Sequence, residues 1–506
     1  MNFINEFCNN GSIVKDLNNS FIALIPKIGN PTSIIDFRPI SLLESMYKVL
    51  AKVLANRMKK VMGSVIGDSQ MAFVKNRQIV DSFVIAEEII HKWKGDKKGG
   101  LLVKLDFEKA YDSVDHGYLD EMMEDMGFCE RWKGWIKECI SSPQLSVLVN
   151  GCPTTTFGVE RGLRQGNPLS PFLFNIVVEG LNSMLHKAIN LDLVSGECFG
   201  GNDVQVSHIQ FADDTILFLK PKVEYLCNVK RILRCFELVS GLKINFHKSC
   251  VVRVVKGLEE EAIPWASIFR WNKASLAITY LGLPMGARPG RNSFWNPIVN
   301  KIEKRLAPWK KRFLSKGGRL VLIKSVLASI PNYFLSIFKI PVGVAQKIER
   351  IQMSFLWGDG KFKRKVHAVN WVEVCKSKVK GGLGIGRVVD KNKAMLAKWI
   401  WHFGREKKAL WRRVMVAKAV HCLLKTGSPS SKLVEEGFRV VVGKGDRADF
   451  WNEIKWDSKP LKDAFPRIYA LAVKKCGTIR EFGNWVSSEW VWDVKTKRRL
   501  FDWEQQ

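Results

Sequence analysis

Acidic residues stand where apolar, β-like runs end, and this pattern constrains the fold more than any other feature of the chain. Residues 101–105 read LLVKL, which is typical of a buried strand, and Asp106 follows directly. Further along, two β-like runs, residues 204–211 and 215–220, flank the pair Asp213–Asp214. This arrangement predicts a β-hairpin with two acids at its tip. If the hairpin pairs with the first strand, all three carboxylates meet at one edge of a sheet.

Carboxylates that lie this close repel one another unless a cation sits between them. Mg²⁺ prefers oxygen ligands and keeps coordination sites free for substrate phosphates. A pair of such ions can lower the pKa of an attacking hydroxyl and stabilise the leaving oxygen of a phosphoryl displacement. The residues leave two interpretations open: a metal site made by Asp106, Asp213 and Asp214, or a solvated hairpin turn, in which Asp is common.

The charge of the chain indicates a polyanionic partner. Its 506 residues include 80 Lys and Arg against 49 Asp and Glu, a formal net charge of +31. A surface this basic attracts nucleic acid before other partners. Net charge that served solubility alone would be spread evenly, but residues 291–390 hold 21 Lys and Arg against 5 Asp and Glu. Three stretches with helical apolar spacing lie in the same region, so we expect a basic helical bundle there.

Cysteine usage and the N-terminus indicate an intracellular protein. The 11 cysteines are scattered and form no C-x-x-C pair, which is typical of reduced thiols. The start, MNFINEFCNN, lacks the features of a signal peptide, and no uncharged apolar run reaches the length of a membrane span. We expect the nucleus, the cytoplasm or both, with no membrane partner. The sequence does not indicate the oligomeric state.

Seven short motifs follow one another along the chain, and each alone would be weak. Together and in this order they resemble the motifs of reverse transcriptases from plant LINE-type (non-LTR) retrotransposons. The motifs are LIPKIGNP…IIDFRPISLL at 24–43, QMAFVKNRQI at 70–79, LDFEKAYDSV at 105–114, RGLRQGNPLSPFLF at 161–174, FADDT at 211–215, GLKINFHKS at 241–249 and YLGLPMG at 280–286.

The resemblance implies an α+β fold of the right-hand polymerase type. Residues 1–286 would form largely helical fingers and a palm with an antiparallel sheet backed by helices. Residues 287–400 would form a basic, thumb-like helical region, and residues 401–506 an accessory extension, helical and rich in tryptophan. Of the 18 tryptophans, 15 lie at Trp265 or beyond.

The activity that the resemblance implies is RNA-directed DNA polymerisation, in which a DNA primer 3′-hydroxyl is extended with dNTPs on an RNA template. The metal site would hold two Mg²⁺ ions, with Mn²⁺ as a substitute. Its ligands would be Asp106, Asp213, Asp214 and the backbone of Phe107.

The resemblance also assigns residues to the nucleotide site. Lys27 and Arg38 would clamp the triphosphate, and Gln165 and Gly166 would contact the nucleotide and template. Tyr111 would reject a ribose 2′-hydroxyl by its bulk, and Lys248 would protonate the leaving pyrophosphate. Simpler roles remain open: Tyr111 as a core aromatic, and Lys27 and Lys248 as solvated surface lysines.

The basic helical region would grip the primer–template duplex through its phosphates, without reading sequence. Its tryptophans would either stack on bases or pack between helices. The expected phosphate-binding side chains are Lys301, Lys304, Arg305, Lys310, Lys311 and Arg312.

The sequence departs from the family pattern at two positions, of which the first bears on activity and the second exchanges one flat aromatic for another. Asn167 stands where the family has Asp, and Phe211 where Tyr is commoner. The motifs expected for an endonuclease, a zinc-binding segment and a ribonuclease H are also missing, so we expect a fragment. The alternatives to an active reverse transcriptase are an inactive nucleic-acid-binding remnant and a group II intron-type maturase. An RNA-dependent RNA polymerase is disfavoured by Tyr111, because such enzymes must admit ribonucleotides.

Overall fold

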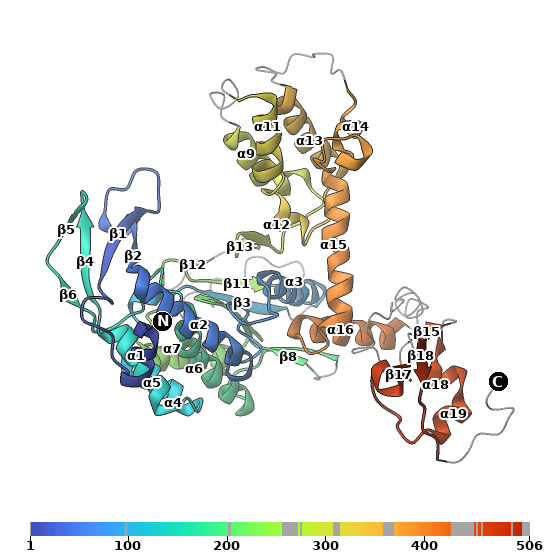
Figure 1. The fold of residues 1–506 in the computed structure, drawn as a ribbon, viewed down its shortest axis with the longest axis horizontal. Helices are drawn as coiled ribbons and strands as arrows, with labels where there is room; N and C mark the ends of the chain where they lie inside the picture. Colours follow the sequence, from blue (N-terminus) through green and yellow to red (C-terminus); the bar gives the residue numbers. More distant parts are fainter. Residues whose placement is uncertain are drawn as a thin grey trace. The chain divides into compact units, whose positions relative to one another are not determined.

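The structure is a computed structural model, and the chain divides into two compact units, Met1–Lys418 and Ala419–Gln506 (Figure 1). The boundary expected at residue 400 falls inside helix α15 (Val388–Arg405). The structure describes residues 2–96, 99–200, 204–255, 272–273, 276–306, 314–357, 369–426, 450–451, 454–456, 459–486 and 489–497.

A mixed α+β arrangement, as expected from the sequence, is built around one central sheet. In the described part of the chain its strand order is β12-β11-β3-β10-β9. The pairs β3–β10, β9–β10 and β3–β11 are antiparallel, and only the short β12 pairs in parallel. The strands are β3 (Gly100–Leu105), β9 (His208–Phe211), β10 (Asp214–Leu219), β11 (Cys250–Val254) and β12 (Asn272–Lys273).

Both faces of this sheet are buried, which explains why its strands read as almost continuous apolar runs. Successive side chains of a strand point to opposite faces. Leu101, Val103 and Leu105 therefore belong to one hydrophobic core, and Leu102, between them, belongs to the other.

Helices on either side supply the rest of the two cores. Helix α3 (Ile79–Gly95) shares the core of Leu102 with the helices that follow residue 287. The described helices sharing the core of Leu101 are α1 (Asn2–Asn10), α2 (Ser45–Val65), α4 (His116–Asp125), α5 (Glu130–Ser141), α6 (Ser170–Asn190) and α7 (Val223–Ser240).

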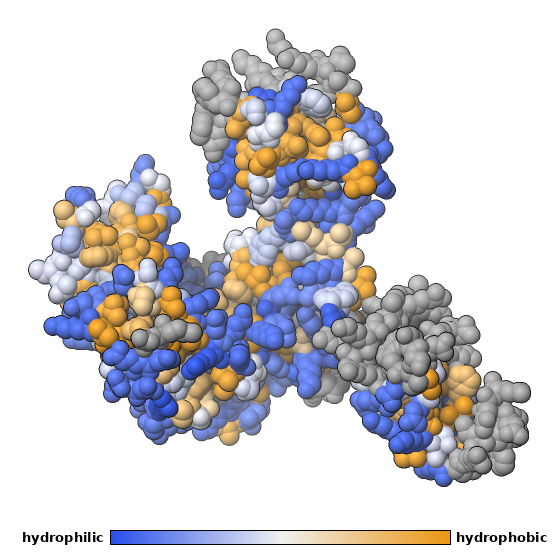
Figure 2. All heavy atoms as spheres, in the orientation of Figure 1, coloured by the Kyte–Doolittle hydropathy of each residue, from blue (hydrophilic) through white to orange (hydrophobic). Residues whose placement is uncertain are grey.

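The fingers segment, expected to be mainly helical, also carries a sheet. Strands β1 (Ser20–Pro26) and β2 (Phe37–Leu43) form an antiparallel hairpin, and β4 (Gln144–Val149) joins β1 in parallel. The short β5 (Cys152–Pro153) and β6 (Phe157–Gly158) pair with β4. Apolar side chains remain exposed on this sheet, where Figure 2 shows hydrophobic colour over β1, β2 and β4. The β1–β2 hairpin matters for the site because it carries two of the predicted nucleotide-binding residues.

The described residues between 287 and 426 are mainly helical, as the apolar spacing of this region predicts. Its helices bury one apolar face in the core shared with α3, and Ile302, Ile348 and Phe355 are examples. No helix in the described ranges is both long and apolar enough to cross a membrane. The helices of this region are α9 (Asn296–Arg305), α11 (Lys316–Leu322), α12 (Asn332–Leu335), α13 (Val342–Trp357), α14 (Trp371–Cys375), α15 and α16 (Leu410–Thr426).

The second unit has a small core of its own. Phe450, Trp451 and Phe482 pack together, with the Phe450 and Phe482 rings stacked at 4.3 Å between centroids. Around this core, the part that the structure describes holds two short hairpins and two short helices. The hairpins are β15 (Ile454–Trp456) with β16 (Lys459–Pro460) and β17 (Gly483–Val486) with β18 (Glu489–Trp492), and the helices are α18 (Leu461–Ala464) and α19 (Pro466–Leu471). Trp451, which is 2% exposed, serves packing here.

Candidate active site

The hairpin predicted around the two adjacent acids is present, and it brings them to the first acid. Phe211 pairs with Asp214 across the turn, and Thr215 pairs with Leu105 of β3. One further step along the same antiparallel register sets Asp214 beside Asp106. Neighbouring residues in such a pair have Cα atoms about 4.5–5.5 Å apart. The three acids therefore come from two adjacent strands at one edge of the central sheet.

The turn that carries Asp213 has an unusual backbone. Ala212, its first residue, has φ +55°, whereas Asp213 does not have a positive φ. This is the pattern of a tight hairpin turn in which glycine is the usual first residue. A side chain in the left-handed region costs about 1–2 kcal/mol, so the surroundings must hold Ala212 in place.

The first acid is fixed by the segment that follows α7. The Asp106 backbone N–H donates to Ser249 Oγ at 3.1 Å, and its carbonyl accepts from the Asn245 N–H at 2.8 Å. Lys248, in the same segment, places its Nζ 3.8 Å from Asp106 Oδ1. The two side chains are 68% and 26% exposed, so this ion pair is solvated and weak. The motif at 241–249 thus lies directly against Asp106.

The acids influence one another electrostatically. Burial is the main cause that raises the pKa of Asp213, and the charge of Asp106 raises it further, whereas Arg38 and Lys248 oppose the shift. The pKa of Asp214 is also raised, first by burial and then by Asp213 and Asp106, against the charge of Lys104. No ion pair between described residues neutralises Asp213 or Asp214. The site is therefore a group of carboxyls with too little positive charge around it.

A divalent cation fits the chemistry of this group. The three acids offer only oxygen ligands, which Mg²⁺ prefers, and a bound cation would supply the missing charge. As the side chains stand, however, no three His, Cys, Asp or Glu in the described ranges converge closely enough to form a metal site. We therefore regard Asp106, Asp213 and Asp214 as ligands that a cation would draw together. The Phe107 backbone lies beside them, bridged to Ile244.

Tyr111 lies next to the acids. Its ring stacks on Phe174 with centroids 4.8 Å apart and an angle of 20°. Its pKa is raised to about 12, first by burial and then by the charge of Asp213. Its backbone carbonyl accepts from the Leu163 N–H at 2.6 Å. Tyr111 is thus both a partly buried aromatic of the core and a neighbour of Asp213.

The loop at 161–167 contacts both the segment around Tyr111 and the β1–β2 hairpin. The Gln165 carbonyl accepts from the Ser41 N–H at 2.8 Å, and Gln165 Nε2 donates to Asp112 Oδ1 at 3.3 Å. Gly166 has φ +105°, and a Cβ there would lie 3.1 Å from the Ser41 carbonyl oxygen. The positive φ favours glycine at 166, and the close approach of β2 leaves little room for a side chain there.

The two basic fingers residues lie on the β1–β2 hairpin. Arg38 is exposed on β2, opposite Ile25, and its charge reaches Asp213. Lys27 is also exposed, but its Nζ donates to the Ile35 carbonyl at 2.9 Å and so closes its own hairpin. Its charge opposes the rise in the pKa of Asp112 that burial causes. Arg38 is thus the freer of the two for a phosphate.

Asn167, which stands where the family has Asp, is buried in the core. Asn167 is 4% exposed, its Nδ2 donates to the Tyr47 hydroxyl at 3.0 Å, and its Oδ1 accepts from the Leu169 N–H at 3.1 Å. An aspartate could keep the second bond and accept from Tyr47 instead of donating to it. The substitution therefore changes a buried contact of the loop rather than the group of acids.

The expected nucleic-acid-binding residues are described only in part. Lys301, Lys304 and Arg305 are exposed on α9, opposite buried residues such as Ile302. Lys310, Lys311 and Arg312 lie outside the described residues. A shallow hollow on α9 is lined by Ser293, Asn296, Pro297, Asn300, Lys301 and Lys304.

The sequence motifs did not predict every residue that holds the acids and the turn beside them. Gln70 stands in the motif at 70–79, but that pattern gave it no role, although its side chain bonds the backbone of Ala212. Ser249 and Asn245, which fix Asp106, were likewise overlooked. Gln70 stands out in the structure as a polar residue buried in a loop. This burial cannot be read from the sequence, so no sequence signal pointed to Gln70.

Comparison with known proteins identifies this class of fold and site as a nucleic-acid polymerase. Residues 25–285 match the family described as "Reverse transcriptase (RNA-dependent DNA polymerase)". This match spans more than half of the chain, and all three acids lie within it. The chain therefore belongs to the reverse transcriptase family.

Several curated proteins are similar over part of their length. The "Transposon TX1 uncharacterized 149 kDa protein" of Xenopus laevis is 29% identical over 364 residues, covering 70% of this chain and 27% of that protein. The retrovirus-related Pol polyprotein from type-2 retrotransposable element R2DM of Drosophila melanogaster is 25% identical, covering 65% and 30%. A putative ribonuclease H protein of Arabidopsis thaliana is 31% identical, covering 32% and 29%. The chain spans less than a third of each relative.

Among solved structures, telomerase from Candida Tropicalis in complex with the TWJ fragment of telomeric RNA is similar at 13% identity. The match covers 87% of this chain and 67% of that chain, with a TM-score of 0.38. This value is too low for a comparison of the two sites.

The charge imbalance predicts that the acids destabilise the chain when no metal is bound. Because the pKa of Asp213 and Asp214 is raised on folding, the cost is present above the raised pKa and disappears as the pH falls below the ordinary carboxyl pKa of about 4. The Asp213→Asn/Asp214→Asn variant should therefore have a Tm about 2 °C or more above that of the parent at pH 7 in EDTA, and this gain should shrink toward pH 4.

Added Mg²⁺ is the control in the same thermal measurement. It should raise the Tm of the parent chain and leave that of the double variant unchanged, because only the parent binds the ion. A double variant that melts below the parent at pH 7, or equal stabilisation of both by Mg²⁺, would contradict the assignment.

Proposed function

We propose that this chain is the reverse transcriptase part of a non-LTR retrotransposon. It extends a DNA primer with dNTPs on an RNA template. The observation that carries the proposal is the register that sets Asp106 beside the Asp213–Asp214 hairpin, within the segment that matches the family. The similar proteins whose names include a transposon or a retrotransposable element support the choice of element. A plant source is consistent with the similar Arabidopsis thaliana protein, and the chain would act in the nucleus or the cytoplasm.

Asp106, Asp213 and Asp214 would hold the divalent cations, with the Phe107 backbone beside them. Mg²⁺ bound there, or Mn²⁺ in its place, would supply the charge that favours attack by the primer hydroxyl and departure of pyrophosphate. The raised pKa of Asp213 and Asp214 supports this role, because carboxyls in such surroundings gain from a cation.

The remaining residues would bind and select the nucleotide. Arg38 suits the triphosphate because its guanidinium can bind phosphate oxygens in pairs, and Lys27 adds a point charge to the same hairpin. Tyr111, held by Phe174 and Leu163, would fill the space of a ribose 2′-hydroxyl. Gln165 and Gly166 would line the template side.

Lys248 would act on the leaving group, and helix α9 would bind the duplex. Lys248 would donate a proton to the leaving pyrophosphate, and its Nζ, 3.8 Å from Asp106 Oδ1, supports this role. Lys301, Lys304 and Arg305 would bind the phosphates of the duplex along the exposed face of α9.

Primer extension tests the proposal directly. The purified chain should extend a DNA primer on an RNA template in Mg²⁺, and Asp213→Asn/Asp214→Asn should lower the rate by about 100-fold or more, because it removes charges that act in the transition state. Asp192→Asn/Glu224→Gln, which changes two exposed acids on other segments, is the matched control. A parent chain that binds the duplex without extending the primer would instead be an inactive nucleic-acid-binding protein.

Tyr111 gives a prediction on sugar selection. Tyr111→Val removes the bulk, so incorporation of ribonucleotides relative to deoxynucleotides should rise by roughly 10-fold to 100-fold. Tyr111→Phe keeps the ring that stacks on Phe174 and should leave selection unchanged. The measurement is the ratio of kcat/KM for the two sugars, and equal ratios in the parent and Tyr111→Val would show that Tyr111 is a core aromatic only.

Helix α9 gives a prediction on salt dependence. Replacing Lys301, Lys304 and Arg305 together by alanine should weaken duplex binding and reduce the slope of log Kd against log salt by up to about 3. The control triple Lys52→Ala/Arg57→Ala/Lys60→Ala removes the same charge from the exposed side of α2. Equal effects of both triples would mean that net charge, and not α9, binds the duplex.

A further inference from the structure

The segment between α2 and α3, residues 66–78, lies against the hairpin that carries Asp213. The Gln210 N–H of β9 donates to the Ser69 carbonyl at 2.8 Å, and the Met71 N–H donates to the Gln210 carbonyl at 2.8 Å. The segment thus continues the sheet for one residue beyond β9, through a bridge between Gln70 and Gln210.

Gln70 reaches from this segment into the turn. Its side chain is buried, with the residue 1% exposed. Its Oε1 accepts from the Ala212 N–H at 2.9 Å and from the Ala72 N–H at 2.9 Å, and its Nε2 approaches the Ala212 carbonyl at 3.4 Å. One carboxamide therefore binds both backbone polar groups of Ala212, the residue with positive φ directly before Asp213.

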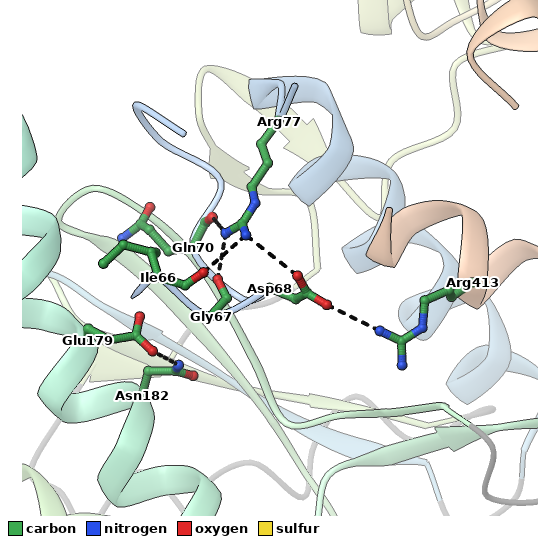
Figure 3. A network of polar contacts seen from close by, with 8 residues as sticks. All are labelled: Ile66, Gly67, Asp68, Gln70, Arg77, Glu179, Asn182 and Arg413. Atoms are coloured by element: carbon green, nitrogen blue, oxygen red, sulfur yellow. Dashed lines mark hydrogen bonds and ion pairs between the residues drawn. The ribbon is translucent and has the colours of Figure 1, made fainter. Parts of the chain in front are cut away.

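Arg77 holds the segment from which Gln70 projects (Figure 3). Its NH1 donates to the carbonyls of Gly67 at 2.5 Å and Gln70 at 2.7 Å, and its NH2 donates to the carbonyl of Ile66 at 3.1 Å. Three backbone carbonyls on one guanidinium leave the segment little freedom. The Gln70 backbone is therefore fixed before its side chain binds the turn.

Close packing on α6 adds a second restraint. A Cβ at Gly67 would lie 2.4 Å from Asn182 Nδ2 and 3.0 Å from Glu179 Oε1, so the segment approaches the helix as closely as a backbone can. At the outer end of these contacts, Arg413 NH1 of α16 lies 3.2 Å from Asp68 Oδ2. Both side chains are about half exposed, so this pair is screened by solvent and carries no part of the inference.

We infer that Gln70 is a positioning residue of the polymerase site: it holds Ala212 in its left-handed conformation and thereby aims Asp213 and Asp214 at the position of the cations. The inference rests on the proposed function of those two acids. Without the carboxamide, the Ala212 N–H and carbonyl lose their partners, and the turn is no longer held in this one conformation. That relaxation would turn the Asp213 side chain away while β10 remained paired with β3.

The test compares Gln70→Met with Gln352→Met, in the full chain. Methionine has nearly the shape of glutamine but cannot hold the turn by hydrogen bonds. Gln352, on α13, is 2% exposed and far along the chain from the acids, so it controls for loss of a buried carboxamide. Hydrogen exchange of the peptide around Ala212 should be about tenfold faster in Gln70→Met and unchanged in Gln352→Met.

Kinetics separate positioning from simple loss of stability. In Gln70→Met, kcat should fall about tenfold or more and the Mg²⁺ concentration for half-maximal rate should rise, with KM for the dNTP and Kd for the duplex unchanged. Gln70→Glu keeps the acceptor for the two N–H groups and should restore part of the exchange protection. This variant also guards against a Gln70→Met chain that fails to fold.

Each outcome decides the inference. Equal exchange and equal kinetics in Gln70→Met and Gln352→Met would overturn it, and so would a loss confined to Tm. A parent chain that extends no primer would refute the proposed polymerase function, whereas the exchange comparison would still show whether Gln70 holds the turn.

Discussion

The pairing of β10 with β3 is the interaction on which the rest of the site depends. Side chains alternate between the faces of a strand, so a slip of one residue would move every apolar side chain of β10 to the opposite core. Both faces of the sheet are buried, and the register is therefore fixed by apolar packing along the whole strand. The position of Asp214 beside Asp106 follows from that packing and needs no attraction between the acids themselves.

The two apolar cores hold the turn at Ala212 and the two acids beside it in an arrangement that is unfavourable by itself. Ala212 adopts a backbone conformation that glycine would adopt more easily, and the pKa of both neighbouring acids is raised. Such strain and uncompensated charge persist only where the surroundings impose them. Here the surroundings are the two apolar cores, the backbone contacts of Asp106, and the Gln70 carboxamide. A cation would relieve the electrostatic part of this cost, which couples metal binding to the stability of the chain.

The sequence predicted those parts of the site that are local. Apolar runs of strand length ending in Asp106 and at Asp213 indicated where the strands stop, and the helical spacing around Ile302 indicated the helices after residue 287. These patterns depend on neighbouring residues and on burial of one or two faces. The roles of Tyr111 and Lys248 came from the family resemblance and stay predictions; in the structure the charge of Asp213 acts on Tyr111, and Lys248 Nζ lies 3.8 Å from Asp106 Oδ1.

Contacts between distant segments could not be predicted in the same way. Gln70 and Ala212 are 142 residues apart, and nothing in either neighbourhood indicates the other. The same holds for Asn167, whose side chain turns to Tyr47 of α2. The pairing of β1 with β4 was not predicted either, since it joins segments more than 100 residues apart.

Cleavage of the chain by bound iron would test the central claim most directly. Fe²⁺ can take the place of Mg²⁺ at oxygen ligands, and with ascorbate and peroxide it cuts the backbone close to where it is bound. If Asp106, Asp213 and Asp214 hold one metal site, cuts should appear both near residue 106 and near residue 213, and excess Mg²⁺ should suppress both together. Cuts near only one of the two strands, or cuts that Mg²⁺ does not suppress, would contradict a site shared by β3 and the β9–β10 hairpin.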